Sequence, residues 1–389
     1  MLLEKLIARF MAITILILIA IAFLKENLNR VELIGDTSSA SPSKMTAMVA
    51  DNETQVAPLK EDIRVLGYSA VDYEGDDRSY QSVRKYHEYL DAVSTFSYLV
   101  DRQGNLTGTP PVEELELHRQ KGIISLALIH NYTNNMFDSE LAASVLGSPE
   151  KRKNLVDNII KELTRNSYSG VNVDIENIPY SQRDNYVKLL AELKDELENL
   201  ERDEKYYLIA SVPAKTDDDI NHSWSAGFDY KAIGQYTDKV QLMTYDEHWF
   251  GGEPGPIASI GWVEDVIKYA VSAIEPEKIL LGIPSYGYRW ASDGSCEPVT
   301  PEEVYNIVEN NKDEVLWHED NKAPYYIFTN AKDITFTTWF ENTESISYKL
   351  DLVNKYNLGG IALWRLGFEE PEMWKAVEQK LSYNKTTDQ

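Results

Sequence analysis

Two acidic side chains and one amide alternate with apolar side chains in the stretch GVNVDIE at residues 170–176. Successive side chains of a β-strand point to opposite faces, so Asn172, Asp174 and Glu176 share one face. Carboxyl groups that are buried side by side raise one another's pKa, and a carboxyl that stays protonated near neutral pH can act as a general acid. The spacing therefore predicts a proton-donating site at the end of a strand.

Polar or large aromatic side chains also close two other apolar runs. Tyr245 and Asp246 end the run that begins KVQLM at Lys239, and Trp364 ends GGIALW. Each has a structural alternative: Tyr245 as a packed strand end, Asp246 as a helix cap or turn residue, and Trp364 as a core residue. The carboxylates of VDIE, taken alone, also suit a solvated edge strand. Together the three runs favour one common site.

Eight short apolar runs, separated by longer stretches with helical spacing, predict the element order. They begin at Ile63, Ala92, Gly122, Gly170, Tyr206, Lys239, Lys278 and Gly359. Near-continuous apolar strands that alternate with helices indicate a parallel sheet covered on both faces. Eight is the strand number of a closed (β/α)8 TIM barrel, and a doubly wound open sheet is the alternative. In a TIM barrel the C-terminal ends of the strands carry the active site, which would bring the residues above together.

Two segments between the runs are informative. Residues 181–200 place Tyr186 and four leucines at helical spacing, which predicts a helix packed outside the strand that ends near Glu176. About 70 residues separate the seventh and eighth runs, and YYIFT and ITFTTWF within them are typical of strands. We therefore predict an α/β barrel over residues 62–385 with a small α+β insertion at about 288–342.

The N-terminal residues 1–30 are predicted to be a membrane anchor or a signal segment. An apolar run at about residues 10–24 follows Lys5 and Arg9 and ends at Lys25. The run is shorter than the ~20 residues that cross a hydrocarbon core, which favours a cleaved signal, but no small-x-small cleavage site follows it, which favours an anchor. Residues 31–61 have the composition of a flexible linker. Both alternatives place the barrel outside the cytoplasm, either anchored to the membrane or secreted.

Composition excludes several classes of protein. The formal net charge of −25 and the pI near 4.7 disfavour nucleic acid as a partner. The single cysteine, Cys296, leaves neither an intrachain disulfide nor a cysteine zinc site, and His130, His222 and His318 lack metal-ligand spacing. We expect no metal and no cofactor. The acidic surface favours a monomer.

The same motifs resemble glycoside hydrolase family 18, whose fourth strand carries Asp-Gly-x-Asp-x-Asp-x-Glu. Residues 169–176 keep the last two acidic positions as Asp174 and Glu176, but Ser169 and Asn172 replace the first two aspartates. MTYD at residues 243–246 is similar to the family's sixth-strand motif, and Trp364 stands where the family floors its sugar subsite. Within the family, GVNVDIEN, MTYDEHWFGGEPGPIASIGWV and KILLGIPSYGYRW look most like the bacterial peptidoglycan N-acetylglucosaminidases that attack spore cortex.

The resemblance implies substrate-assisted retaining hydrolysis, in which the 2-acetamido oxygen of the sugar replaces an enzyme nucleophile. Glu176 would then protonate the leaving oxygen and later deprotonate water, and Asp174 would orient the acetamide and stabilise the positive intermediate. Tyr245 would hydrogen-bond the acetamide oxygen. Asn172 can hold Asp174 by a hydrogen bond but cannot take up a proton, so we expect a pH optimum that differs from that of an aspartate pair.

Sugar contacts are expected from the ends of several strands and the loops that follow them. We predict that the substrate-binding residues are Asn172, Asp246, Trp364, Trp249, Tyr286 and Arg289. Trp249 belongs to the loop HWFGGEPGP, whose glycines and prolines also suit a surface turn.

Three functions compete. The main hypothesis is a hydrolase that cleaves β-1,4 bonds after N-acetylglucosamine in peptidoglycan, with the membrane as a second partner through the N-terminal helix. A chitinase or chito-oligosaccharide hydrolase is the nearest alternative, because the same motifs serve both substrates. A non-catalytic sugar-binding barrel is the third, and the presence of Glu176 argues against it.

Overall fold

The computed structural model describes residues 62–200 and 205–381. The predicted N-terminal membrane segment and the linker at 31–61 lie outside these residues. Among the described helices, none combines the length and the apolar character that a membrane span requires.

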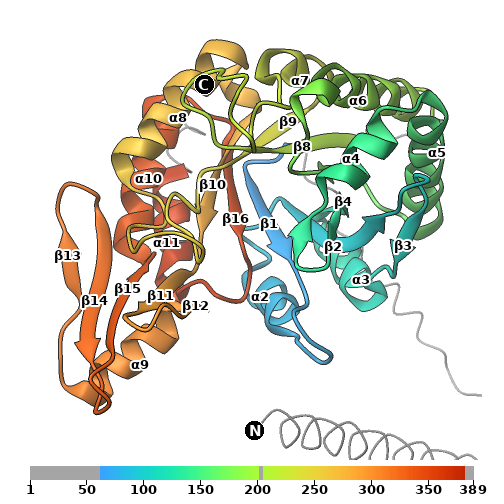
Figure 1. The fold of residues 1–389 in the computed structure, drawn as a ribbon. Coiled ribbons are helices and arrows are strands. Elements are labelled where there is room, and N and C mark those ends of the chain that lie inside the picture. The colour runs from blue at the N-terminus through green and yellow to red at the C-terminus, as the bar shows by residue number, and fades with distance from the viewer. Residues whose placement is uncertain (1–61, 201–204, 382–389) are drawn as a thin grey trace, which may run out of the picture. The chain divides into compact units, whose positions relative to one another are not determined.

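Eight parallel strands form a closed barrel, which confirms the predicted fold class (Figure 1). Their order around the barrel is β1, β16, β10, β9, β8, β7, β4 and β2, and the parallel pairing of β1 with β2 closes the ring, which excludes an open sheet. The strands are β1 Val65–Ser69, β2 Ala92–Val100, β4 Ile124–His130, β7 Gly170–Asp174, β8 Tyr207–Pro213, β9 Lys239–Met243, β10 Ile279–Pro284 and β16 Gly360–Trp364. Each lies within one of the eight apolar runs, apart from Ser69 at the end of β1 and His130 at the end of β4.

The short strand β3 Leu106–Gly108 pairs antiparallel with β2. Helices surround the barrel. They are α2 Arg78–Tyr86, α3 Val112–Lys121, α4 Ser139–Leu146, α5 Pro149–Asn166, α6 Arg183–Glu198, α7 Tyr230–Tyr236, α8 Ile260–Ala273, α10 Thr343–Lys355 and α11 Pro371–Leu381. Single 3₁₀ turns at Tyr180–Gln182 and Pro276–Lys278 precede α6 and β10. The predicted helix over 181–200 is α6, which buries Tyr186, Leu189, Leu190, Leu193 and Leu197.

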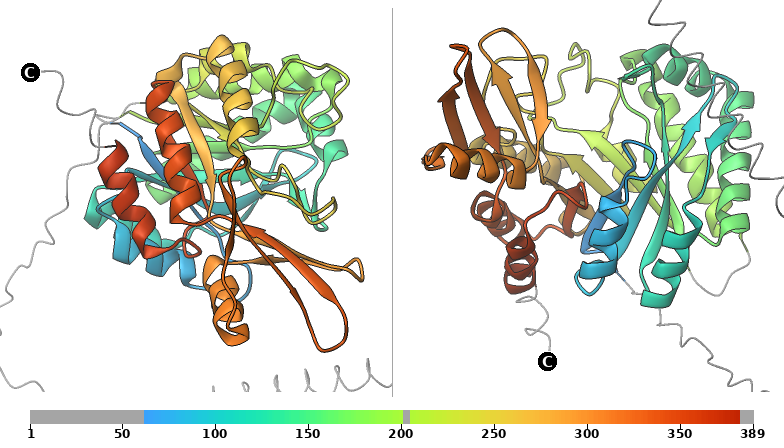
Figure 2. Two further views of the ribbon diagram at one scale, coloured as in Figure 1. Left: turned by 90° about the vertical axis from the view of Figure 1, so that its left-hand side faces the viewer. Right: turned by 90° about the horizontal axis from the view of Figure 1, so that it is seen from below.

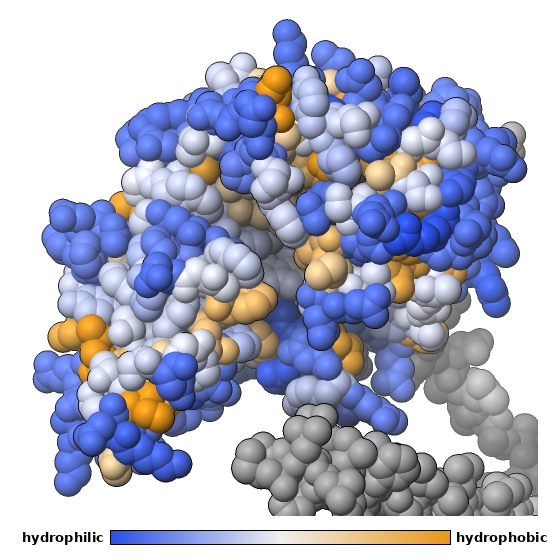
Figure 3. Space-filling model, in the orientation of Figure 1, coloured by the Kyte–Doolittle hydropathy of each residue, from blue (hydrophilic) through white to orange (hydrophobic). Residues whose placement is uncertain are grey.

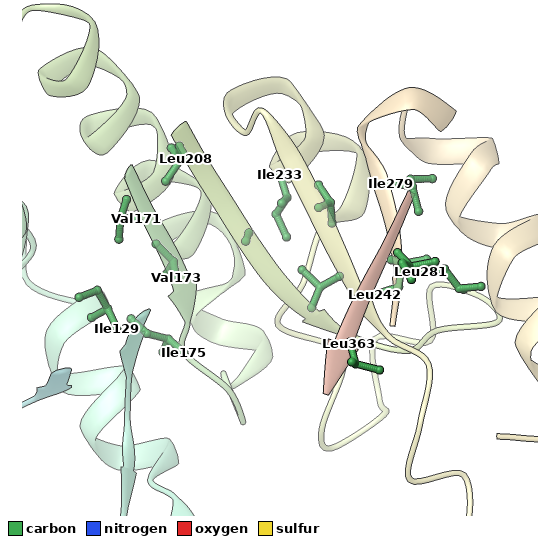
Figure 4. Close-up of a cluster of buried hydrophobic side chains, with 14 of the residues drawn as sticks. Ile129, Val171, Val173, Ile175, Leu208, Ile233, Leu242, Ile279, Leu281 and Leu363 are labelled. Atoms are coloured by element: carbon green, nitrogen blue, oxygen red, sulfur yellow. The ribbon is translucent and has the colours of Figure 1, made fainter. Parts of the chain in front are cut away.

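The apolar core has two layers because the strands alternate their side chains. The outer layer lies between the strands and the helices. It includes Val171 and Val173 of β7, and Ile175, which directly follows that strand (Figure 4). The inner layer fills the barrel with side chains such as Leu66, Leu126 and Ile209. Polar side chains on the inward face of a strand must therefore lie within or just above a packed interior.

Residues after β10 form a second, smaller lobe. Its five-stranded antiparallel sheet has the order β12, β11, β15, β14, β13, and it projects from the barrel in Figure 2. The elements are β11 Gly287–Ala291, β12 Cys296–Val299, α9 Pro301–Asn311, β13 Leu316–His318, β14 Ala323–Thr329 and β15 Thr335–Phe340. The two strands predicted from YYIFT and ITFTTWF are β14 and β15. Val299, Val304, Val308, Tyr326 and Phe340 form the lobe's own core.

A buried ion pair joins this lobe to the barrel. Lys349 of α10 donates to Glu341, which directly follows β15, at 2.7 Å, and both side chains are fully buried. Ser345 donates to the same carboxylate at 2.6 Å. Burial raises the pKa of Glu341, and the ammonium of Lys349 opposes this increase. Each charge therefore depends on the other to remain in the interior.

We predict that Lys349→Met lowers the free energy of unfolding by about 3–5 kcal/mol, because it leaves a buried carboxylate without its cation. The double variant Lys349→Met/Glu341→Leu should recover most of this loss, since no charge then remains. Chemical denaturation of the three proteins measures both values. Equal losses in the single and double variants would show that the ion pair is not the source of the effect.

Candidate active site

The general-acid candidate follows a strand that the barrel buries completely. Strand β7 ends at Asp174, and Glu176 lies two residues further on the same side of the chain, while Val173 and Ile175 pack outward against helices (Figure 4). Asp174 is 6% exposed and Glu176 is 7% exposed. Both carboxyls are thus almost removed from water yet lie at the C-terminal mouth of the barrel, where a substrate can reach them.

Below the two carboxyls, Asn172 belongs to a closed ring of hydrogen bonds. Its Nδ2 donates to Tyr68 Oη at 2.8 Å and to Ser94 Oγ at 3.2 Å, and its Oδ1 accepts from Ser211 Oγ at 3.1 Å. Tyr68 Oη and Ser211 Oγ lie 3.0 Å apart, so the hydroxyl of Tyr68 completes the ring. These residues come from β7, β1, β2 and β8, and the ring ties four strands together with no net charge.

The surroundings of Asn172 correct the expectation that it binds substrate. Its side chain has no exposed surface, so a sugar cannot touch it in this arrangement. Its amide is bonded to the three hydroxyls rather than to Asp174, and no hydrogen bond between Asn172 and Asp174 occurs among the described residues. Asn172 therefore acts on the site only through the side chains around it.

Burial raises the pKa of both carboxyls. For Asp174 the loss of solvation is the largest cause. For Glu176 the loss of solvation is again the largest, and the charges of Asp174 and then Asp246 raise the pKa further. The pair cannot ionise fully without placing two like charges in a poorly solvated space. This environment favours a proton on the pair.

Tyr245 lies across the mouth from these carboxyls, after β9. The side chain of Gln241, in β9, points into the barrel, and its amide donates a hydrogen bond to Tyr245 Oη at 3.4 Å. A Cβ atom at Gly282 of β10 would lie 2.9 Å from the Tyr245 ring, so only glycine leaves room for it there. Burial raises the pKa of Tyr245, and the charges of Tyr68, Asp174 and Glu176 act in the same direction. Its hydroxyl therefore remains protonated and can donate a hydrogen bond.

Asp246 adopts a left-handed backbone conformation with φ 59° and is held by two tyrosines of the lobe side. Tyr286 Oη donates to its Oδ1 at 2.5 Å, and Tyr288 Oη donates to the same oxygen at 3.2 Å. The carboxylate is accessible to solvent, but protein surrounds it on most sides, and this environment raises its pKa. Asp246 thus links the mouth of the barrel to the cluster of Tyr286, Tyr288 and Trp290.

Trp364, at the end of β16, lies half-buried over the inner layer of the core. Its ring makes edge contacts with Tyr68 at 5.4 Å and Phe96 at 6.0 Å between centroids. The next peptide, Trp364–Arg365, is cis. Ser285 fixes the backbone after it, because Ser285 Oγ donates to Arg365 O at 2.6 Å. A flat apolar face held in this way suits the floor of a sugar site.

The two remaining predicted contacts differ in position. Trp249 is 48% exposed. Its ring contacts the ring of Phe250 edge-on, with 5.0 Å between the centroids, and the rest of its surface beside the mouth is open to solvent. Arg289 lies on β11 between Tyr288 and Trp290, and the alternation of the strand turns it to the opposite face. Its guanidinium pairs with Glu297 at 2.6 Å and lies over Phe336. The structure therefore separates Arg289 from the carboxyl pair.

Figure 3 shows that this side of the molecule is hollowed between the lobe and the facing part of the barrel.

Several polar residues of the mouth were missed from the sequence. Tyr68, Ser94 and Ser211 point inward from otherwise apolar strands, and applying the alternation rule to every run would have found them. Tyr288 follows the same rule on β11. Trp224 and Asn131, which lie next to Glu176, belong to loops without any periodic pattern. Among residues 62–200 and 205–381, no group of three or more His, Cys, Asp or Glu side chains could hold a metal ion.

Comparison with known proteins agrees with this geometry. The family described as Glycosyl hydrolases family 18 matches residues 138–369, a range that holds all the site residues discussed above except Tyr68, Ser94, Phe96 and Asn131. The chain belongs to glycoside hydrolase family 18, and it is a glycosidase of that family.

Relatives in two substrate groups resemble the chain. It is 31% identical over 318 residues to an uncharacterized glycosylase, YvbX, of Bacillus subtilis (strain 168), covering 81% of this chain and 90% of the relative. The spore cortex-lytic enzyme SleL of Bacillus megaterium QM B1551 superimposes with a TM-score of 0.76 at 26% identity, covering 83% and 75% of the two chains. A chitinase from Chromobacterium violaceum ATCC 12472 gives a TM-score of 0.75 at 29% identity, covering 82% and 99%.

We predict that Glu176→Gln stabilises the fold more at pH 8 than at pH 4. The pKa of Glu176 is higher in the folded chain than in the unfolded chain. The contribution of Glu176 to the free energy of unfolding is therefore fully present below the unfolded pKa of about 4.3, and it is lost as pH rises towards the folded pKa. Glutamine does not ionise and so avoids this loss. Each pKa unit of difference corresponds to about 1.4 kcal/mol. Thermal unfolding across this pH range measures the effect.

The matched control is Glu378→Gln, because Glu378 is exposed on α11 and far from the site in the fold. Its difference from the native chain should stay small at every pH. A Glu176→Gln difference that is equally independent of pH would contradict the raised pKa.

Proposed function

We propose that the chain hydrolyses the β-1,4 bond after N-acetylglucosamine in peptidoglycan by substrate-assisted retaining catalysis. The observation that carries the proposal is the buried pair of Asp174 and Glu176, whose mutual charge and loss of solvation favour a retained proton. A proton held at this place is what protonation of a glycosidic oxygen requires. The membership of the chain in family 18 supports the same chemistry.

The proposed first step breaks the glycosidic bond. Glu176 gives its proton to the leaving oxygen, while the acetamide oxygen of the same sugar attacks the anomeric carbon and forms an oxazolinium-like intermediate. Asp174, which is the ionised member of the pair while Glu176 holds the proton, accepts the acetamide N–H and stabilises the positive charge. Tyr245 donates its hydroxyl to the acetamide oxygen and holds it in line. Trp364 forms the apolar floor beneath the ring.

The second step reverses the role of Glu176. Its carboxylate takes a proton from water as the water oxygen attacks the anomeric carbon, and the acetamide oxygen leaves. The product keeps the configuration of the substrate, and Glu176 is protonated again for the next cycle. No second protein carboxylate is needed as a nucleophile, which agrees with the engagement of Asp246 by Tyr286 and Tyr288.

Two observations support peptidoglycan over chitin, and one supports the alternative. The chain resembles the spore cortex-lytic enzyme SleL, and Asn172 replaces the aspartate of the usual motif. The similar resemblance to a chitinase makes hydrolysis of chitin or chito-oligosaccharides the second candidate. A non-catalytic sugar-binding barrel is the third, although it would not need the buried proton.

We also propose that the enzyme acts outside the cytoplasm as a monomer, with residues about 10–24 as an anchor or a cleaved leader.

We expect the barrel from about Asp62 onward to release new reducing N-acetylglucosamine ends from purified peptidoglycan, as measured by mass spectrometry. Glu176→Gln should lower this rate by about 10²- to 10⁴-fold, because removal of a general acid costs that much. Glu378→Gln should leave it unchanged. Cleavage of chito-oligosaccharides alone would favour the chitinase, and binding of either glycan without cleavage would favour the binding protein.

Substrate assistance makes its own prediction. Glycan strands in which N-acetylglucosamine has been chemically deacetylated should resist the native enzyme, because the free amine cannot attack the anomeric carbon. Product analysis of native and deacetylated peptidoglycan, at equal concentrations of enzyme, measures this difference. Equal cleavage of the two would exclude the acetamide as nucleophile.

A further inference from the structure

A small aromatic hairpin stands beside Glu176 on the side away from Trp364's strand. It consists of β5 Tyr132–Thr133 and β6 Met136–Phe137, which pair antiparallel after β4. The turn residues Asn134 and Asn135 have φ 52° and 62°, as a two-residue type I′ turn requires, and asparagine tolerates this conformation. The hairpin is therefore a defined structure rather than a loose loop.

The hairpin is fixed to the backbone of Glu176 itself. Asn131 Oδ1 accepts the backbone N–H of Glu176 at 2.9 Å, and Asn131 Nδ2 donates to the backbone oxygen of Glu176 at 2.9 Å. Asn177 Nδ2 donates to the backbone oxygen of Phe137 at 3.1 Å. Glu176 and Asn177, which follow β7, thus clamp the base and the second strand of the hairpin, and Phe137 is held beside the backbone of Glu176.

Trp224 approaches the same place from the loop after β8. Its ring makes an edge contact with the ring of Phe137, with 6.3 Å between the centroids and 81° between the planes. Trp224 also lies near enough to Glu176 to lower the pKa of its carboxyl. The loop is anchored close by, because Arg183 Nη1 donates to Ala226 O at 3.0 Å. A Cβ atom at Gly227 would lie 2.2 Å from Ile178 O, so the loop packs against the chain just after Glu176.

Despite these contacts, Trp224 keeps 38% of its surface exposed. A general acid must lie beside the oxygen that joins the reacting sugar to the leaving sugar. A partly exposed aromatic side chain beside the acid is therefore in a position to border the leaving sugar. Trp364, by contrast, lies over the barrel interior with Tyr68 and Phe96, where the reacting sugar would rest.

We propose that Trp224, supported by Phe137, forms the binding surface for the sugar on the leaving-group side. This rests on the proposed function, because it takes Glu176 as the acid and base.

The sugar contact is tested by binding in the inactive Glu176→Gln background. Isothermal titration with soluble glycan fragments of peptidoglycan, and separately with tetra-N-acetylchitotetraose, should show about tenfold weaker binding after Trp224→Ala, the loss of one aromatic stacking surface. The matched control is Trp317→Ala in the lobe. Equal affinities of the two variants for both glycans would overturn the sugar contact, whether or not the native enzyme cleaves either glycan.

Discussion

The structure depends on the burial of two carboxyls, Asp174 and Glu176, at the mouth of an otherwise apolar barrel. Placing them there is unfavourable in itself, and the fold accepts it because the surrounding parallel strands are packed on both sides. Under the proposed function, this unfavourable environment is also what supplies the chemistry, since it favours a proton on the pair. Stability and reactivity at this site therefore oppose each other, as they do in many enzymes.

The neutral ring beneath the pair has a specific effect on this balance. With asparagine at position 172, the hydroxyls of Tyr68, Ser94 and Ser211 are all satisfied without a third ionisable group. An aspartate there would share protons with Asp174 and spread the titration over three sites. In this chain the titration is confined to Asp174 and Glu176, with Asp246 as a more distant influence.

The sequence was sufficient for the barrel because its strands obey a simple rule. Eight apolar runs gave the strand count, and alternation within GVNVDIE correctly separated the inward side chains from Val173 and Ile175, which face helices. Alternation also explains the failures: Arg289 follows Tyr288 on β11 and so turns away from the mouth, and Asn172 lies one layer too deep to meet a sugar. The position of Trp224 had no signal in the sequence, because the path of an irregular loop depends on tertiary contacts such as those of Arg183 and Gly227.

The clamp from Asn131 and Asn177 divides the hairpin after β4 into two parts with different freedom. Its base is bonded to the backbone of Glu176, whereas Met136 near its turn is 62% exposed. Substitutions at the tip can therefore alter the surface offered to a glycan without moving the acid. A change at Asn131, about 45 positions earlier in the chain than Glu176, would instead disturb the acid directly. Under the proposed function, changes in glycan preference at the tip of the hairpin would therefore be separable from changes in the reaction itself.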